Sequence, residues 1–209
     1  MSVLVTGANG FIGTHLVDRL LTGGYEVVGY DNFSTGKYSS VKWGPYIKGN
    51  IGDKKKLANV LKKYNPKAVF HLAALTSISE SEKFPKKYFR NNVTNSIKLI
   101  ETVISHKIKY FIFSSTCSVY GNSKKGYVTE KTKTKPINKY GMGKLYVEKQ
   151  LKKFYKKKGL YSVSLRYFNV AGADPDLEIG DKNYNSSKII PKIFNNISKK
   201  KSLMVYGNK

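Results

Sequence analysis

The sequence predicts an α/β protein: a doubly wound parallel sheet followed by the beginning of a small C-terminal subdomain. Two observations predict it. Short apolar, β-branched runs alternate with segments of helical periodicity, and a glycine-rich turn joins the first run to the first helix. Parallel strands with helical crossovers are buried on both faces, which fits such continuous apolar runs. The length of 209 residues allows one large domain, or one domain and part of another.

Hydrophobic patterning places the elements along the chain. The expected strands are Ser2–Gly7, Glu26–Tyr30, Tyr46–Ile51, Ala68–Ala73, Lys109–Ser115 and Tyr161–Phe168. The expected helices are Phe11–Leu21, Lys54–Tyr64, Phe84–His106 and Tyr140–Lys158. The composition then turns polar over Asp174–Lys188, before an amphipathic stretch at Ile189–Ile197 and a possible strand at Ser202–Tyr206. We therefore expect two domains, residues 1–168 and 169–209.

The formal charge of +25 comes from 38 Lys and Arg against 13 Asp and Glu. Only three of the cations are Arg, the residue that forks onto guanine edges and phosphates. The lysines are spread along the chain in short clusters, which favours solvated helix faces over an anionic partner. We expect no nucleic acid among the partners, although binding through the lysine clusters stays a third, weaker possibility.

Other compositional features limit the class further. No apolar run approaches the roughly 18 residues that a membrane span needs, and the N-terminus has no basic region typical of a signal peptide. The single Cys117 excludes an internal disulfide framework and a multi-cysteine metal site. We expect no membrane association, no metal and a cytoplasmic location.

A glycine-rich turn, Gly7-Ala8-Asn9-Gly10-Phe11-Ile12-Gly13, follows the first strand and opens the first helix. Glycines let backbone N–H groups approach a pyrophosphate at a helix N-terminus, so this context predicts a dinucleotide site rather than a plain turn. Asp31 closes the second strand, where a carboxylate can accept hydrogen bonds from both adenosine ribose hydroxyls. Such a carboxylate repels a 2′-phosphate, which favours NAD over NADP. A loop or helix-cap role for Asp31 is the alternative.

Reactive side chains follow the fifth strand and open the last long helix. Ser114 and Thr116 stand at a strand end, where side chains enter the ligand crevice of such a sheet. Tyr140 and Lys144 share one helix face, and an ammonium beside a phenol lowers the pKa of that phenol. We expect Tyr140 to be an acid–base group, and we expect Thr116 to form a hydrogen bond with the substrate oxygen. The alternative is an unimportant helix-surface pair.

Four further residues are interpreted as structural. His71 lies inside an apolar strand, which favours a hydrogen-bonding role over catalysis. His15 and His106 are expected on helix surfaces, and Cys117 is expected to be a small packing residue.

The order of these motifs resembles the extended branch of the short-chain dehydrogenase/reductase superfamily, which acts on nucleotide sugars, and within it the UDP-glucose 4-epimerase family. The resemblance covers essentially the whole chain and is carried by VTGANGFIG (5–13), Asp31-Asn32, HLAA (71–74), SSTCSVYG (114–121), Tyr140–Lys144 and LRYFNVAGAD (165–174). The related dehydratases carry an Asp-Glu pair where this chain has Cys117 and Ser118, so the acid that would expel water is missing.

The resemblance implies roles for individual positions. NAD would be held by Gly7, Gly10, Phe11, Ile12, Asp31, Asn32, Asn50, Ile51, Leu72, Ala73, Ala74, Leu75, Asn91, Ser114, Tyr140, Lys144 and Tyr167. The catalytic set would be Thr116, Tyr140 and Lys144. Thr116, Asn169, Lys188 and Ile189 would contact a UDP-sugar substrate.

The resemblance also implies an activity: interconversion of UDP-glucose and UDP-galactose at C4 through a 4-keto intermediate, by a homodimer. Family members continue well beyond residue 209 with a segment that clamps UDP, and this chain has Asn50, Thr76 and Lys188 where other residues are usual. Two alternatives therefore stay open. One is an NAD-binding fragment with little or no activity, and the other is a related epimerase acting on UDP-N-acetylhexosamines.

Overall fold

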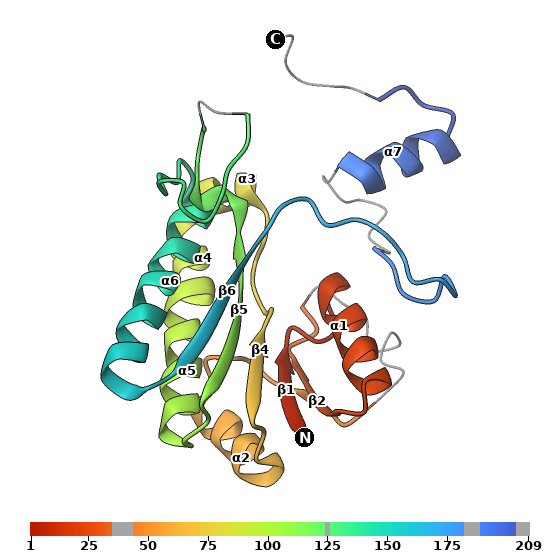
Figure 1. Ribbon diagram of the computed structural model, residues 1–209. Coiled ribbons are helices and arrows are strands. Elements are labelled where there is room, and N and C mark those ends of the chain that lie inside the picture. The colour runs from red at the N-terminus through yellow and green to blue at the C-terminus, as the bar shows by residue number, and fades with distance from the viewer. Residues whose placement is uncertain (35–43, 124–125, 182–188, 204–209) are drawn as a thin grey trace. The chain divides into compact units, whose positions relative to one another are not determined.

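The computed structural model describes residues 1–34, 44–123, 126–181 and 189–203. Its contacts divide the chain into two units, Met1–Phe168 and Asn169–Lys209. The first unit contains the whole sheet, and the second contains a turn and one helix (Figure 1).

The first unit is built on a sheet of six parallel strands in the order β3-β2-β1-β4-β5-β6. The strands are β1 (Ser2–Thr6), β2 (Glu26–Asp31), β3 (Tyr46–Lys48), β4 (Ala68–His71), β5 (Tyr110–Thr116) and β6 (Tyr161–Tyr167). This order confirms the predicted doubly wound, Rossmann-type class. The chain winds one way from β1 to β3 and the other way from β4 to β6, so the switch point at which folds of this class bind ligands lies at the carboxyl ends of β1 and β4.

Helices cover the sheet on both faces. The helical elements are α1 (Phe11–Thr22), α2 (Lys54–Tyr64), α3 (Ile78–Lys83), α4 (Pro85–Tyr88), the π-helix η2 (Phe89–Thr94), α5 (Asn95–Ser105), the 3₁₀ turn η3 (Cys117–Val119) and α6 (Lys139–Lys158). Figure 1 shows α1 on one face and α5 and α6 on the other. Each face has its own apolar core, and the larger core lies beneath α2, α5 and α6.

The central strand β1 shows why both faces are needed. Val3, Leu4 and Val5 are each at most 1% exposed. Leu4 packs into the core under α5, whereas Val3 and Val5 pack into the core under α1. A strand that is apolar at every position can be buried only between two layers of helices.

Local signals set the helix ends. The Asp53 side chain accepts a hydrogen bond from the N–H of Lys56 at the start of α2. Asn138 is the N-cap residue of α6, and Gly159 is its C-cap residue. Gly159 has a φ of +67°, the left-handed backbone conformation that is common after the last residue of a helix.

The largest differences between the structure and the predicted elements lie in three places. The expected helix Phe84–His106 is α4, the π-helix η2 and α5 in succession. The sequence analysis did not predict α3, because six residues are too few for an apolar period; Ser77 caps it. Strand β3 stops at Lys48 rather than at Ile51, since a turn closed by a hydrogen bond from Asp53 N–H to the Asn50 carbonyl follows it.

Strand β6 forms one edge of the sheet and keeps apolar side chains exposed. Tyr161 is 53% exposed, Val163 is 56% and Leu165 is 38%. These three alternate with Ser162, Ser164 and Arg166, so they share one face of the strand. A groove beside them is lined by Tyr110, Phe111, Ile112, Lys152, Tyr155, Lys156, Tyr161, Ser162 and Val163.

The second unit contains a turn closed by an antiparallel bridge between Ala173 and Gly180, and the helix α7 (Ile189–Ser198). Ser202 and Leu203 lie outside any strand, and the rest of the possible strand Ser202–Tyr206 falls outside the described residues. Within the described ranges, no helix is long and apolar enough to cross a membrane. The same ranges contain no group of His, Cys, Asp and Glu suited to a metal ion.

Truncation of a core leucine tests this packing. Leu99 in α5 is fully buried, so Leu99→Ala leaves a cavity and is expected to lower the free energy of unfolding by about 2–5 kcal/mol in urea titrations. The matched control is Leu177→Ala, because Leu177 is 82% exposed. Equal losses for the two variants would contradict the assigned core.

Candidate cofactor-binding and catalytic site

The turn between β1 and α1 has no room for a side chain at Gly7, and the first turn of α1 has none at Gly13. Gly7 has a φ of +72°, and its N–H donates to the Tyr30 carbonyl oxygen at 2.9 Å. A Cβ on Gly7 would lie 2.5 Å from the backbone nitrogen of Ala73, and a Cβ on Gly13 would overlap the Gly7 carbonyl. Gly10 is the N-cap of α1 and supplies no side-chain cap. A helix N-terminus approached only by bare backbone suits a pyrophosphate.

Asp31 and Asn32 lie at the carboxyl end of β2, beside this turn. The Asp31 carboxylate accepts hydrogen bonds from the N–H of Asn9 at 3.0 Å and from the N–H of Phe33 at 2.8 Å. The Asn32 side chain accepts from the N–H of Ser34 at 3.0 Å. Asp31 is thus fixed against the glycine turn, where the ribose carboxylate of a dinucleotide site is required.

Asn50 and Ile51, the residues expected beside the adenine, lie in the turn after β3. The Tyr30 hydroxyl donates to the Asn50 carbonyl at 3.0 Å, and the Gly52 N–H donates to the Asn50 side-chain oxygen at 2.8 Å. Ile51 is 5% exposed and packs into the larger core. Its side chain is committed to packing, so a role beside the adenine falls to its backbone.

The segment Leu72–Leu75 follows β4 and is held by an asparagine that the sequence analysis missed. Asn92 accepts from the Leu75 N–H at 2.9 Å and donates to the Leu75 carbonyl at 2.8 Å. Asn91, an expected cofactor contact, donates to the Asn92 side-chain oxygen at 2.9 Å. Both asparagines lie in η2, and π-helical turns often occur at functional sites. The only sequence signal was the Asn-Asn pair within an apolar helix.

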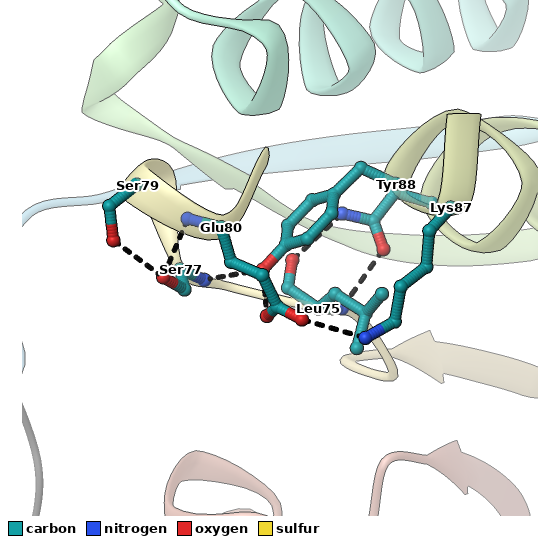
Figure 2. A network of polar contacts seen from close by, with 7 residues as sticks. Leu75, Ser77, Ser79, Glu80, Lys87 and Tyr88 are labelled. Atoms are coloured by element: carbon teal, nitrogen blue, oxygen red, sulfur yellow. Dashed lines mark hydrogen bonds and ion pairs between the residues drawn. The ribbon is translucent and has the colours of Figure 1, made fainter. Parts of the chain in front are cut away.

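A second polar network anchors the chain after this segment (Figure 2). The Ser77 N–H donates to the Tyr88 hydroxyl at 3.1 Å, and that hydroxyl donates to Glu80 at 2.9 Å. Lys87 donates to the other Glu80 oxygen at 2.7 Å. Burial and the Glu80 carboxylate raise the pKa of Tyr88 to about 12, so the phenol stays protonated as a donor.

The expected catalytic residues meet where β5 ends against α6. Lys144 is 2% exposed, and its Nζ donates to the Ser114 carbonyl at 2.6 Å. The same Nζ lies 4.8 Å from the centre of the Phe113 ring and 5.8 Å from the centre of the Tyr140 ring. Thr116 is 7% exposed at the end of the strand. The structure thus brings together Ser114, Thr116, Tyr140 and Lys144 from two elements.

The first turn of α6 is fixed on both sides of Tyr140. The Asn138 side chain accepts from the Gly141 N–H at 2.7 Å, and Glu82 accepts from the Lys139 N–H at 2.7 Å. Carboxylates at a helix N-terminus are favourable because the helix dipole is positive there. These caps orient the turn that carries the phenol.

The pKa pattern of this pair differs from the expectation. Burial lowers the pKa of Lys144 to about 7, so its amine is protonated in only part of the molecules at neutral pH. Burial also raises the pKa of Tyr140 to about 12, although its hydrogen bond with Thr116 acts in the opposite direction. Desolvation therefore outweighs the expected lowering of the phenol pKa in the cofactor-free chain. Activation of Tyr140 needs a further positive charge in the site.

His71 has the structural environment expected for it. Its Nδ1 lies 2.7 Å from Thr6 Oγ1 and its Nε2 lies 2.8 Å from Ser96 Oγ. Burial, with a smaller contribution from Lys144, lowers the pKa of His71 to about 3, so the ring is neutral near pH 7. It links β1, β4 and α5 beneath the crevice.

The remaining expected residues divide between the two units. Tyr167 ends β6 and pairs in register with Thr116, and burial raises the pKa of its hydroxyl. Asn169 and Ile189 belong to the second unit, where Ile189 begins α7 and is 53% exposed. Lys188 falls outside the described residues. Substrate contacts by these three residues stay predictions.

A buried carboxylate that the sequence analysis missed lies one helical turn beyond Lys144. Glu148 is 3% exposed and pairs with Arg166 through Nε at 3.0 Å and Nη2 at 2.7 Å. The Ser115 hydroxyl also donates to Glu148. The sequence signal was available: Glu148 continues the Tyr140–Lys144 face at the same spacing.

Comparison with known families agrees with this arrangement. A model of the NAD dependent epimerase/dehydratase family matches residues 3–209. The chain belongs to this family. The family's dependence on NAD fits two features of this chain. The N-terminus of α1 at the glycine turn has no side-chain cap, and Asp31 lies at the end of β2.

Individual relatives are more specific. The chain is 41% identical over 190 residues to a UDP-glucose 4-epimerase of Rhizobium meliloti (strain 1021), covering 91% of this chain and 58% of the relative. The structure of a UDP-glucose 4-epimerase from Brucella ovis in complex with NAD matches with a TM-score of 0.89 at 41% identity, covering 91% and 59% of the two chains.

A third relative is named for a different nucleotide sugar. A UDP-N-acetylglucosamine 4-epimerase from Methanobrevibacter ruminantium M1, in complex with UDP-N-acetylmuramic acid, matches with a TM-score of 0.88 at 35% identity, covering 99% of this chain and 66% of that one. The chain thus spans roughly three-fifths of the length of these relatives.

Two glycines of equal backbone conformation provide a test of the turn. Gly7→Ala is expected to weaken NAD binding at least tenfold by calorimetry, because the new Cβ would push the turn away from Ala73. Gly24 is the control, since it has a φ of +77° with no atom within 4 Å of its Cβ position. Gly24→Ala should keep NAD affinity, and equal losses would argue against the turn as the pyrophosphate site.

The pH dependence of the free energy of unfolding tests the burial of Lys144. Its pKa is about 7 when folded and near 10.5 when unfolded, so the unfolded chain binds more protons in between. Stability therefore gains from Lys144 as the pH rises from 7 to 10, at about 1.4 kcal/mol per pH unit when fully developed. Lys144→Met should remove this slope in urea titrations. Lys149→Met, at an exposed position of α6, should keep it.

Proposed function

We propose that the protein is an NAD-dependent epimerase that inverts C4 of a UDP-bound hexose. The observation that carries this proposal is the meeting of Thr116, Tyr140 and Lys144 at the crevice end of the sheet that also carries the glycine turn. Bound NAD would supply a hydride acceptor and donor for C4 of the sugar. The turn at Gly7, Gly10, Phe11 and Ile12 would hold its pyrophosphate, and Asp31 would hold its ribose.

The side chains divide the proton chemistry between them. Tyr140 removes the proton of the 4-hydroxyl and returns it to the inverted alcohol, while Thr116 hydrogen-bonds the same oxygen. Lys144, in its protonated form, stabilises the phenolate of Tyr140. The positive charge of the oxidised cofactor acts in the same direction. Because the 4-keto sugar must present both faces to one hydride site, the sugar is held loosely and the UDP firmly.

The substrate class follows from the relatives and from the missing dehydratase pair. The relative from Rhizobium meliloti is named for UDP-glucose and the one from Methanobrevibacter ruminantium for UDP-N-acetylglucosamine. We take UDP-glucose and UDP-galactose as the substrates, with Asn169, Lys188 and Ile189 on the UDP side, and UDP-N-acetylhexosamines as the alternative. Cys117 and Ser118 carry no carboxylate, so expulsion of water is not supported.

A second candidate function is an NAD-binding unit without turnover. It is favoured by one observation: every proposed cofactor residue lies in Met1–Phe168, whereas Asn169, Lys188 and Ile189 lie in the second unit. We assign residues 1–168 to the cofactor and 169–209 to part of the nucleotide-sugar site. Loss of turnover with full NAD affinity would support this candidate.

We also infer a cytoplasmic homodimer. Phe84, Phe89, Met142 and Tyr146 are 45% to 56% exposed on α4, η2 and α6, or directly beside them. The rings of Phe89 and Tyr146 lie 6.4 Å apart, so the two elements present one apolar surface. A second copy would cover it, which sedimentation would reveal as a mass near twice that of the monomer.

The role of Tyr140 can be tested directly. Tyr140→Phe is expected to reduce turnover of UDP-galactose by about 100- to 10,000-fold, because it removes the acid–base group and little volume. NAD affinity should stay within threefold. The control is Tyr155→Phe on the same helix, where Tyr155 is 51% exposed and turnover should not change.

The outcomes separate the candidates. Turnover of UDP-galactose by the 209-residue chain, lost in Tyr140→Phe, supports the epimerase. If the wild-type chain binds NAD and converts neither UDP-galactose nor a UDP-N-acetylhexosamine, the epimerase proposal fails for this chain and the NAD-binding unit stands.

A further inference from the structure

The ion pair between Glu148 and Arg166 is almost completely removed from water, with side chains 3% and 18% exposed. Arg166 meets Glu148 through two parallel hydrogen bonds, at 3.0 Å and 2.7 Å. Its third group, Nη1, donates to the Tyr120 hydroxyl at 2.9 Å, and its guanidinium carbon lies 4.9 Å from the centre of the Tyr120 ring. The pair is therefore satisfied on both sides, as a buried pair must be.

The pair connects the elements that carry the proposed catalytic groups. Glu148 lies one turn beyond Lys144 and two turns beyond Tyr140 on α6. It accepts the hydroxyl of Ser115, the residue of β5 that stands between Ser114 and Thr116. Ser114 supplies the carbonyl that Lys144 contacts. Glu148 thus contacts β5 at the residue that lies between the two strand residues facing the proposed catalytic groups.

Strand β6 supplies the other half of this connection. Arg166 is in register with Ser115 in the β5–β6 ladder, and Tyr167 is in register with Thr116. The guanidinium and the Ser115 hydroxyl therefore reach the same Glu148 oxygen from neighbouring strands. Hydrogen bonds to Glu148 also raise the pKa of Arg166, which stays charged.

Stability alone does not account for such a pair, because apolar side chains of similar volume usually stabilise a core at least as well. A planar fork on a carboxylate instead fixes a distance and an orientation. We propose that Glu148 and Arg166 are positioning residues that set the spacing between the end of β5 and the first two turns of α6, and so the placement of Tyr140 and Lys144 for proton transfer. This proposal rests on the epimerase function proposed above.

The conservative variant Arg166→Lys is the main test, because it keeps the charge and loses the fork. It is expected to lower kcat by about 10- to 100-fold, as for a catalytic group misplaced by a fraction of an ångström to 1 Å. KM for UDP-galactose and the affinity for NAD should stay within threefold, since neither Glu148 nor Arg166 is among the residues proposed to contact NAD or the sugar nucleotide. Glu148→Gln should behave in the same way.

A matched control uses an ion pair of equal length on the surface. Lys54 and Glu101 lie 2.7 Å apart with side chains 53% and 47% exposed. Glu101→Gln should change neither kcat nor the melting temperature. If Arg166→Lys lowers the melting temperature and leaves kcat at the wild-type value, the pair is only structural and the proposal is overturned.

A spectroscopic measurement on the cofactor-free chain separates this proposal from the proposed function. With ¹³Cζ-labelled tyrosine, the resonance of Tyr140 is identified by its loss in Tyr140→Phe. It should move in Arg166→Lys, whereas that of Tyr64 in α2 should not. Movement in a chain without turnover would support the positioning role while the epimerase fails, and an unmoved resonance would contradict positioning.

Ser115→Ala covers the case in which neither charge variant folds. It deletes one hydrogen bond to Glu148 and leaves the ion pair intact. It is expected to lower kcat about three- to tenfold and to move the Tyr140 resonance in the same direction as Arg166→Lys. Wild-type kcat with an unmoved resonance in this variant would also overturn the proposal.

Discussion

Lys144 keeps an ammonium group almost entirely out of water, and the contacts around it explain much of the first unit. A buried ammonium is costly unless its donors are satisfied and a favourable electrostatic environment surrounds it. The Ser114 carbonyl satisfies one donor and the Phe113 ring covers another side. Both groups belong to β5, so α6 can lie at only one distance from this strand. That distance also brings Tyr140 to Thr116.

The crevice that faces this pair results from the order of the strands. Because all six strands are parallel, their carboxyl ends share one edge. The proposed site residues lie at the strand ends of that edge or directly after them: the glycine turn, Asp31, Leu72–Leu75 and Thr116. Hydrogen bonds from outside the sheet then fix each segment: Asn92 holds Leu75, and Glu82 holds the start of α6. Rigid strands set the coarse position of the site, and these few hydrogen bonds set its detail.

The parts of this site that local spacing determines could be predicted from the sequence. The glycine turn and the Tyr140–Lys144 face each depend on residues within one turn of one another. The helical spacing places Glu148 on the Tyr140–Lys144 face, but its partners lie 18 and 33 residues away, and the partner of Asn92 lies 17 residues away, so no local pattern could assign these contacts. The pKa of Tyr140 was predicted with the wrong sign for the cofactor-free chain. Spacing indicates which groups are neighbours, but desolvation depends on everything packed around them.

The open edge at β6 has a consequence for the behaviour of the chain in solution. Tyr161, Val163 and Leu165 present an apolar strip on a strand whose outer edge pairs with no other strand among the described residues, the arrangement that promotes edge-to-edge association. Lys152 and Lys156 lie in the groove beside this strip, within a chain of charge +25. Mutual repulsion between lysines acts against the approach of two such edges, and dissolved salt screens that repulsion. The lysines outside the proposed site thus oppose association through this edge.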